Sequence, residues 1–553
     1  MLLRAAHLSA ATYYVAVSGS DVNDGRSPQQ AWGTVTYAAT KATAGDTVYI
    51  KAGLYRGEKV VINSSGTQKE PIIFQGYKDK PGDTPDPKYQ PGGPLNPDVL
   101  PVLDGEQAAT ASSWNEGSGI VLQGKSHIEI RNLGVTSYLY GLYPQDSQYV
   151  VIENVFVVNT GSMGMFVLKC AHFTIRNCVV TDAADNNIYP RQTHSSVLEN
   201  CRTYGVSFDK AGATDYYIGL QADCHDNVVR DCLCQNMHAE HTDIHPGHGI
   251  GIKDRADDAG YPEPHSYNNK FINCVARDNG EYLFVAHGAY NNEFVNCTAI
   301  GQWRTQAQWS YGIAIRDGAH DNTFRGCRAE GVRTSLAFQD TVEGPKNPDG
   351  SPLVQICSQN ALVNCVLADS DVGMEISSAD SNLVRNCVFD SVGESALVRF
   401  PFARKDKGNS CRNTIVTNVR GAYHQADNGA DGEISFTYSS FWANAFGMPA
   451  GAGNMAKDPL FVDAAKKAFH LKSRQGHWDE ANSKWVKDEE TSPCIDAGDP
   501  ADDFSAEPEP NGGRINMGAY GGTREASQSP EGERAQGDKE EKWMNQSPKF
   551  VPP

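Results

Sequence analysis

The sequence has no apolar run long enough to span a membrane, and its formal net charge is −19. A membrane-spanning helix needs about 20 consecutive apolar residues. An excess of acidic residues also argues against nucleic acid or an anionic membrane as the main partner, because both carry negative charge. We therefore expect neither a membrane span nor a nucleic-acid partner.

The N-terminus lacks the apolar stretch of a secretory signal peptide. Residues 1–12 carry one positive charge and mainly small side chains. A signal peptide would need an uninterrupted apolar segment behind its positive charge. We interpret residues 1–12 as the remnant of a leader or as an artificial end.

The fourteen cysteines lack the paired spacing of metal ligands within one repeat. Most of them instead close a recurring phrase of an apolar residue, any residue, Asn and Cys, as in the segments that end at Cys178, Cys201 and Cys387. The shortest step between phrases is 22 or 23 residues, as from Cys178 to Cys201. We expect a column of free, buried thiols, because unpaired cysteine is usually a core residue. The Asn before each cysteine suits a turn or an amide stack between repeats.

Each repeat also holds a segment in which apolar residues alternate with small or polar ones. Gly249-Ile-Gly-Ile-Lys253 and Tyr311-Gly-Ile-Ala-Ile-Arg316 are examples. This alternation is typical of a strand with one buried face. A period near 22 is too short for a helical-hairpin repeat. The sequence therefore predicts an all-β fold, a single-stranded right-handed parallel β-helix solenoid with loop insertions along one groove.

The two ends of the solenoid need covers, because an open end exposes core and unpaired strand edges. Residues from about Trp32 to Ala44 form an amphipathic pattern and are predicted to be an N-terminal capping helix. Residues 13–523 are predicted to be the β-helix domain. The polar, charged residues 524–553 are predicted to be a disordered tail.

The two ends also resemble a known group of proteins. The opening contains Gly45-Asp-Thr-Val-Tyr-Ile, and the closing part contains Asp458-Pro-Leu-Phe-Val and Ser492-Pro-Cys-Ile-Asp-Ala-Gly498. These segments resemble right-handed β-helix, pectate-lyase-like proteins of bacteria that act on polysaccharides. The resemblance implies a secreted or periplasmic protein that meets a polysaccharide. It covers lyases, hydrolases, epimerases and non-catalytic binders, so it implies the fold rather than the reaction.

Aligning the repeats on the cysteine phrase places one outward position of each alternating segment in a row. Five of the seven side chains in this row are basic or can become so: Lys169, Arg191, Gln221, Lys253, His287, Arg316 and Gln339. Adjacent coils lie about 4.8 Å apart, so the row can follow an extended polyanion. Outward positions of a β-helix are also often charged without any ligand. We favour a binding groove, because clefts of one sign attract ligands of the other.

Loop insertions are expected to wall this row and to supply further substrate contacts. Tyr217, Trp303 and Trp309 can stack on sugar rings, although some of them are expected to be loop anchors. The segment from His238 to His248 holds four histidines, and His245 is taken as a substrate contact. A histidine-rich segment can bind a transition metal, supply a general acid or base such as His248, or simply pack.

The carboxylates of Asp223, Asp254 and Asp257 suit calcium, although acidic turns are also common without any ion. No organic cofactor is expected. The fit of these aspartates to the calcium of β-helix lyases is incomplete, because the strands themselves lack a clear acidic cluster.

A lyase acting on a uronic-acid polymer by β-elimination is the preferred function. Such an enzyme must neutralise the substrate carboxylate and place a base at the adjacent C–H. Lys253 meets this requirement by position, and the resemblance to β-helix lyases implies the same role for it. His287 or Arg316 is expected to assist the leaving oxygen or hold the carboxylate. The alternatives are a glycoside hydrolase, for which only Glu375 occupies a clear outward strand position and lacks an acidic partner, and a non-catalytic glycan-binding protein.

Overall fold

The computed structural model describes residues 10–106, 110, 117–206, 216–237, 247–254, 265–302, 310–339, 356–400, 406–426 and 434–530. It divides into two compact units. Unit 1 comprises Met1–Asn322 and Gly331–Cys357, and unit 2 comprises Thr323–Glu330 and Ser358–Pro553. Within the described ranges, no helix has the length and apolar character that crossing a membrane requires.

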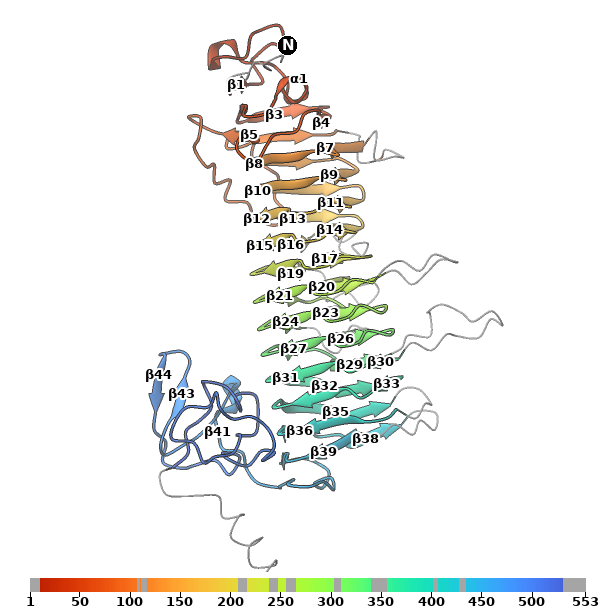
Figure 1. Ribbon diagram of the computed structural model, residues 1–553, viewed down its shortest axis with the longest axis vertical. Helices are drawn as coiled ribbons and strands as arrows, with labels where there is room; N and C mark the ends of the chain where they lie inside the picture. The colour runs from red at the N-terminus through yellow and green to blue at the C-terminus, as the bar shows by residue number, and fades with distance from the viewer. Residues whose placement is uncertain are drawn as a thin grey trace, which may run out of the picture. The chain divides into compact units, whose positions relative to one another are not determined.

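Unit 1 is a stack of coils in which short strands form three parallel columns (Figure 1). The first column contains β1 (Thr12–Val15), β2 (Thr47–Lys51), β5 (Ile72–Tyr77), β8 (Ser126–Thr136), β10 (Gln148–Thr160), β12 (Thr174–Arg176), β15 (Val197–Glu199), β18 (Val228–Arg230), β21 (Lys270–Ile272) and β24 (Glu293–Val295). The second contains β3 (Gly53–Arg56), β6 (Pro101–Asp104), the later parts of β8 and β10, β13 (Val179–Ala183), β16 (Arg202–Gly205), β19 (Leu233–Asn236), β22 (Val275–Arg277) and β25 (Thr298–Ile300).

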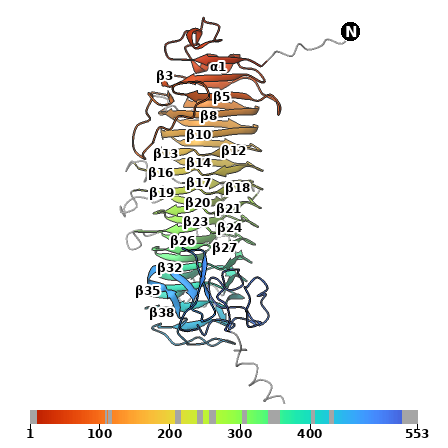
Figure 2. The ribbon, with the colours of Figure 1, turned by 90° about the vertical axis from the view of Figure 1, so that its left-hand side faces the viewer.

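The third column, called the site column below, carries the candidate site. It contains β4 (Val60–Ile62), β7 (Ser118–Gln123), β9 (Tyr140–Gln145), β11 (Met163–Leu168), β14 (Asn186–Arg191), β17 (Tyr216–Leu220), β20 (His248–Lys253), β23 (Glu281–Ala286), β26 (Tyr311–Arg316) and β29 (Thr334–Gln339). Figure 2 shows β14, β17, β20, β23 and β26 one below the other. Residues far apart in the sequence thus become neighbours on consecutive coils.

Unit 2 continues the same repeat and adds an irregular C-terminal region. Its parallel strands are β27 (Thr323–Arg325), β28 (Arg328–Glu330), β31 (Ala361–Val363), β32 (Val366–Ile376), β34 (Leu383–Arg385), β35 (Val388–Phe400), β36 (Asn409–Arg412), β37 (Ile415–Thr417), β38 (Ala422–Ala426), β39 (Ile434–Thr437) and β40 (Ser440–Trp442). Two short strands, β30 (Cys357–Ser358) and β33 (Ala379–Asp380), lie outside these ladders.

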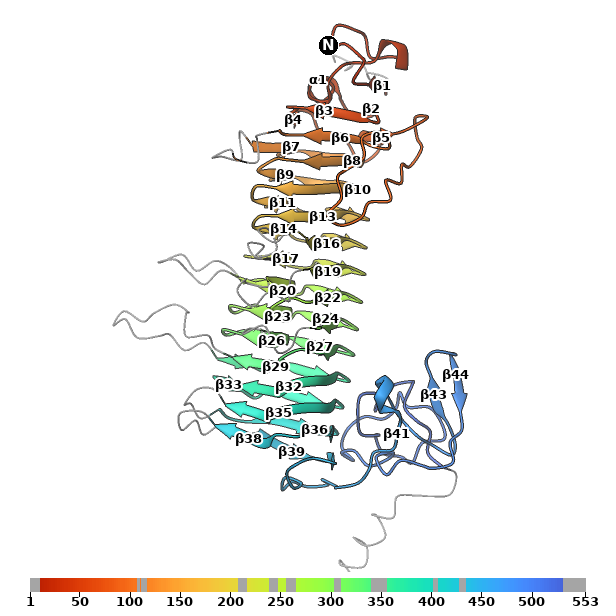
Figure 3. The same cartoon turned by 180° about the vertical axis from the view of Figure 1, so that it is seen from behind.

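The C-terminal region of unit 2 is held by antiparallel pairs and short turns. β41 (Phe461–Asp463) pairs with β42 (Ala468–Leu471), with the 3-10 helix η3 (Ala464–Lys466) between them. β43 (His477–Asp479) pairs with β44 (Lys484–Val486), and Figure 3 shows these two strands side by side. The predicted tail begins too early at residue 524. Residues 524–530 pack in unit 2, where the Ser527 hydroxyl donates to the Leu471 carbonyl. Residues 531–553 lie outside the described residues.

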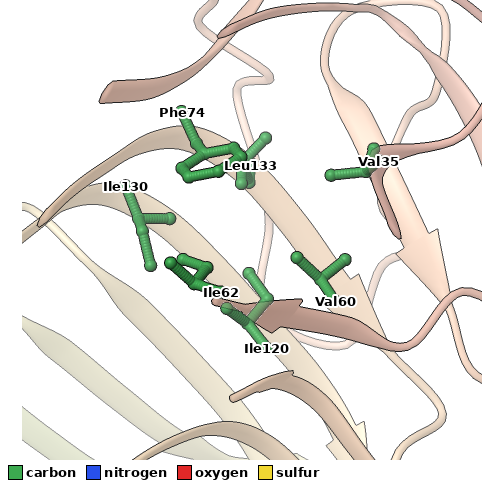
Figure 4. Close-up of a pocket in the computed structure, with 7 residues that line it drawn as sticks. All are labelled: Val35, Val60, Ile62, Phe74, Ile120, Ile130 and Leu133. Atoms are coloured by element: carbon green, nitrogen blue, oxygen red, sulfur yellow. The ribbon is translucent and has the colours of Figure 1, made fainter. Parts of the chain in front are cut away.

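The N-terminal cap forms as predicted but is shorter. A 3-10 turn, η1 (Pro28–Gln30), precedes α1 (Val35–Lys41), and the Thr34 side chain caps α1 by accepting from the Tyr37 amide. Val35 of α1 faces an apolar space at this end of the core (Figure 4). The other residues that line it come from the first coils: Val60, Ile62, Phe74, Ile120, Ile130 and Leu133.

The recurring Asn-Cys phrase has a backbone cause. The residue before the cysteine of each phrase lies in the left-handed region, with φ of 56° at Asn177, 50° at Asn200 and 53° at Asn273. Asn and Asp tolerate this conformation better than most residues. The side-chain Nδ2 of Asn200 donates to the side-chain Oδ1 of Asn177 at 2.8 Å, as expected for an amide stack between coils.

A second amide stack, not foreseen from the sequence, lies inside the coils. Its members are between 0 and 2% exposed: Asn227, Asn269, Asn292 and Asn322. The Asn227 amide donates to Asn269 at 2.9 Å, and Asn269 donates to Asn292 at 3.0 Å. These bonds satisfy polar groups that would otherwise be costly to bury.

All fourteen cysteines are free and buried, so the prediction of core thiols is confirmed. Burial raises the pKa of the Cys170 and Cys224 thiols to about 12. Because all fourteen thiols are buried and labelling needs an accessible thiol, we expect a maleimide to label none of the cysteines in the folded protein and all of them in denaturant. Mass spectrometry checks this. Rapid labelling of several core cysteines in the native state would contradict the packing described here.

Candidate functional site

The site column brings part of the predicted basic row together. Leu168 pairs with Arg191, Arg191 with Gln221, and Arg316 with Gln339. Lys253 pairs with Ala286 rather than with His287. Lys169 and His287 each lie one residue later, in a left-handed turn with φ of 52° and 58°. The single continuous row is therefore corrected to two adjacent rows, because the turn before the next strand varies by one residue.

At the centre of the site lies a carboxylate that the sequence reasoning missed. Glu281 begins β23, and its side chain is 4% exposed. One carboxylate oxygen lies 2.8 Å from His248 Nδ1, and the other lies 2.5 Å from Arg316 Nη2. Burial alone would raise the pKa of Glu281, but the charges of Arg316, His248 and Lys253 hold that pKa well below its ordinary value. Glu281 is therefore an anion at neutral pH.

Lys253 lies on the other side of His248. Its Nζ is 3.4 Å from His248 Nε2 and 5.7 Å from the centre of the Tyr216 ring, which itself stacks on the His248 ring. An ionised carboxylate only accepts hydrogen bonds. Glu281 thus favours the proton on Nδ1 of His248, which leaves the Nε2 lone pair directed at the Lys253 amine. Lys253 is half-buried, whereas the side chain of His248 is 8% exposed.

Two more imidazoles lie beside carboxylates close to this centre. His287 Nε2 is 3.6 Å from Asp317, and His265 Nδ1 is 3.8 Å from Asp254. Burial lowers the pKa of His287; Asp317 opposes this shift, and the charges of Lys253 and Arg316 add to it. The charge of Lys253 is therefore close enough to His287 to affect the pKa of that residue.

The calcium prediction finds little support among the described residues. Asp254 is 1% exposed, and its carboxylate accepts hydrogen bonds from the Ala222 amide and from the amide and hydroxyl of Ser266. A carboxylate engaged in this way does not fit a calcium ligand, which needs free oxygens. Asp223 is half-buried in a turn, and Asp257 lies outside the described residues. Within the described ranges, no three His, Cys, Asp or Glu side chains are grouped so that they could hold a metal.

The remaining predicted contacts are distributed as follows. Tyr217 is fully buried, so its ring is not available to stack on a sugar, contrary to the prediction. Gln221 accepts a hydrogen bond from the Tyr189 hydroxyl, and Gln339 is buried. His245, Trp303 and Trp309 lie outside the described residues. In unit 2, Glu375 forms an ion pair with Arg399 at 3.3 Å.

A signal for Glu281 does exist in the sequence. Glu281 occurs five residues before Ala286, as His248 occurs five residues before Lys253 and Tyr311 five before Arg316. The register confirms this relation, since His248 pairs with Glu281 and Glu281 with Tyr311. Aligning the first residues of these strands, in addition to the last, would have found the carboxylate.

The chain matches two family models and one short segment of a known protein. Residues 118–259 match the model described as right handed beta helix region, and residues 360–498 match the model described as disaggregatase related. An uncharacterized protein, YwoF of Bacillus subtilis (strain 168), is 39% identical over 67 residues. That match covers 12% of this chain and 14% of the other protein.

Solved structures with a similar arrangement are distant in sequence. An alginate lyase from Paenibacillus sp. str. FPU-7 is 13% identical, with 54% of this chain and 93% of that chain covered and a TM-score of 0.39. The pre-mature gene product 12 of bacteriophage phi29 is 13% identical, with 70% and 53% covered and a TM-score of 0.47. The pectate lyase Pel9A is 12% identical, with 92% and 96% covered and a TM-score of 0.31.

The family match and the parallel strand columns agree on the architecture. Residues 118–259 of the match contain the strands from β7 to β20, including Lys253 and His248. The predicted fold is thus confirmed. The chain is a right-handed parallel β-helix protein.

Proposed function

We propose that this protein acts on a polysaccharide, as a lyase that cleaves beside a uronic acid by β-elimination. The proposal depends on two contacts, the one between Lys253 Nζ and His248 Nε2 and the one between His248 Nδ1 and Glu281. In the first contact, a half-buried amine of the site column lies next to an imidazole that can take its proton. We further propose a secreted or periplasmic location, where such a polymer would be met.

The chemistry follows from proton positions. His248 Nε2 accepts the proton of the Lys253 ammonium, and Glu281 stabilises the imidazolium that forms. The neutral Lys253 amine then takes the proton from the carbon next to the substrate carboxylate. The electron pair of that C–H bond forms a C=C bond, and the bond to the glycosidic oxygen breaks. The leaving oxygen takes its proton from water, and the neutral ring of His287 is the candidate to assist it with an N–H hydrogen bond.

The other cations have distinct roles in this proposal. Arg316 is 9% exposed and bonded to Glu281, so it positions Glu281 rather than contacting substrate. Arg191, two coils before Lys253 and half-buried, is placed to attract the substrate carboxylate. Neutralising that carboxylate is what makes the adjacent C–H acidic enough to be removed.

A hydrolase mechanism fits these residues less well. It needs two carboxyl groups, of which one must be protonated to act as an acid. Among the described residues near Lys253, the carboxylates are Glu281, Asp254 and Asp317, and each side chain is between 1 and 4% exposed. Glu281, with its lowered pKa and both oxygens engaged, cannot serve as that acid.

The test is to incubate the protein with pectic, alginate and glycosaminoglycan polymers, with and without calcium, and to follow absorbance in the near ultraviolet. We expect an absorbing, unsaturated product from at least one acidic polymer. New reducing ends without this absorbance would replace the lyase by a hydrolase. Binding without any product would indicate a non-catalytic glycan-binding protein.

A further inference from the structure

Aromatic rings form a continuous strip along the outer face of the site column and lead to His248. The strip consists of Tyr140, Tyr143, Phe166, Tyr189, Tyr216 and His248. Consecutive ring centres are 5.4 Å apart from Tyr143 to Phe166, 5.6 Å from Phe166 to Tyr189 and 5.1 Å from Tyr216 to His248. The Tyr189 and Tyr216 rings are 6.0 Å apart, so no coil interrupts the strip.

Tyr143, Phe166 and Tyr189 face outward, because they alternate with core residues, and the Tyr216 side chain lies against Gly219. Met165 and Val167 flank Phe166 and are at most 1% exposed. Tyr143, Tyr189 and Tyr216 are buried, whereas Tyr140 and Phe166, at the end far from the site, are half-buried. Phe166 lies on β11, three coils before Lys253 on β20, a separation of about 14 Å along the stack. Only an oligomer or polymer could meet both.

The row beside the accessible end of the strip is largely uncharged. Gln123, Gln145 and Leu168 occupy its first positions, and Arg191 and Gln221 follow. Lys169 was predicted for this row but lies in the turn that follows it. Asp146 occupies the equivalent turn position on the preceding coil. Cationic side chains in this row therefore begin at Arg191, close to the proposed reaction centre.

We infer that the substrate is a copolymer in which an acidic sugar alternates with or lies next to neutral sugars, rather than a homopolymer of uronic acid. This inference rests on the proposed function and specifies its substrate class. A homopolyuronate would place a carboxylate at every sugar, including those beside Phe166 and Gln145, where apolar and amide side chains line this row and the nearest cations, Lys169 and Arg191, lie in the turn and on the next coil. The apolar face of a neutral sugar packs on the same surface without the cost of desolvating a charge.

The experiment compares binding and turnover of two groups of polymers. Polygalacturonate and polymannuronate represent the homopolymers; hyaluronan, chondroitin and the rhamnogalacturonan backbone represent copolymers. Binding is measured by retardation in gels that contain each polymer. We expect a copolymer to be bound and cleaved at least 10-fold better than either homopolymer. Phe166→Ala should weaken copolymer binding roughly 3- to 10-fold, the scale of one lost aromatic contact.

Tyr149→Ala is the matched control, because Tyr149 is an aromatic residue with 44% exposure near the start of β10, in the first strand column and outside the site column. It should leave copolymer binding unchanged. Leu168→Lys adds a cation beside the strip and should improve homopolymer binding, which keeps the test decisive even if Phe166→Ala is unstable.

The two proposals fail in different ways. Equal or faster cleavage of a homopolymer, with Phe166→Ala and Leu168→Lys without effect, would overturn the copolymer inference and leave the lyase in place. Preferential copolymer binding that depends on Phe166, without any unsaturated product, would overturn the lyase and retain the strip as a binding surface. Binding of neither group would overturn the copolymer inference directly.

Discussion

Replacing Lys253 with alanine is expected to lower kcat roughly 10²- to 10⁴-fold, the usual contribution of a general acid or base. The half-buried Lys253 amine lies 3.4 Å from His248 Nε2 and is the proposed base. Because its removal deletes a proton acceptor and not a binding surface, KM should change much less than kcat. Initial rates of formation of the unsaturated product measure both constants.

Lys270→Ala is the control for loss of a lysine. Lys270 lies on β21, in the first strand column, where its side chain is 56% exposed and paired with Glu293 at 3.0 Å. Its removal should leave kcat within a factor of two of wild type, roughly the scale of a weak surface ion pair. If Lys253→Ala kept full activity while His248→Ala lost it, the base would be His248, and the role of Lys253 would be refuted.

The regular part of the fold could be predicted because each coil repeats one pattern. The step from Cys178 to Cys201 and the left-handed residue, usually Asn, before the cysteine of each phrase fix where a coil closes. The cap at α1 could be predicted for the same reason, since an open end must be covered. The repeat in the sequence is therefore enough to predict most of the architecture.

The site was less predictable, because it depends on details between the repeats. Counting back from the cysteines placed His287 in the row of Lys253, but the turn there is one residue longer than the turn after Arg191, and Ala286 takes that place. Tyr217 occupies the position equivalent to Gly249 on the next coil. Inward and outward side chains do not alternate strictly at this position, and the Tyr217 ring is buried. A shift of one residue moves a side chain to the opposite face of the strand, so an alignment error of one residue predicts the wrong surroundings for that side chain.

The charge of the groove also differs from the sequence-based expectation. The predicted row counted Arg316 as a free cation, yet this residue is bonded to Glu281 and shielded from solvent. Which charges remain available to a ligand depends on which of them already pair within the protein. That pairing is set by the register between coils about 30 residues apart in sequence, such as Glu281 and Tyr311.

Replacing Glu281 with alanine is expected to destabilise the protein by about 3–5 kcal/mol, because it removes one partner of a buried ion pair. Arg316 and His248 would then lie buried without their counter-charge. Urea-induced unfolding, followed by circular dichroism, measures the change. Glu293→Ala is the matched control, since Glu293 is 32% exposed in its pair with Lys270 and should cost at most about 1 kcal/mol.

The pH dependence of this difference provides an independent check. The pKa of Glu281 is lowered in the folded protein, so its contribution to stability is fully present above the unfolded pKa of about 4.3 and is lost as the pH falls through the folded value. The contribution of Glu281 to the gap in unfolding free energy between wild type and Glu281→Ala should therefore be fully present down to about pH 5. Below about pH 4.3 the gap should narrow, because the unfolded chain then binds a proton that folded Glu281 does not bind. A gap that did not narrow below about pH 4.3, or one below about 1 kcal/mol at pH 7, would show that Glu281 is not the buried anion that contacts His248.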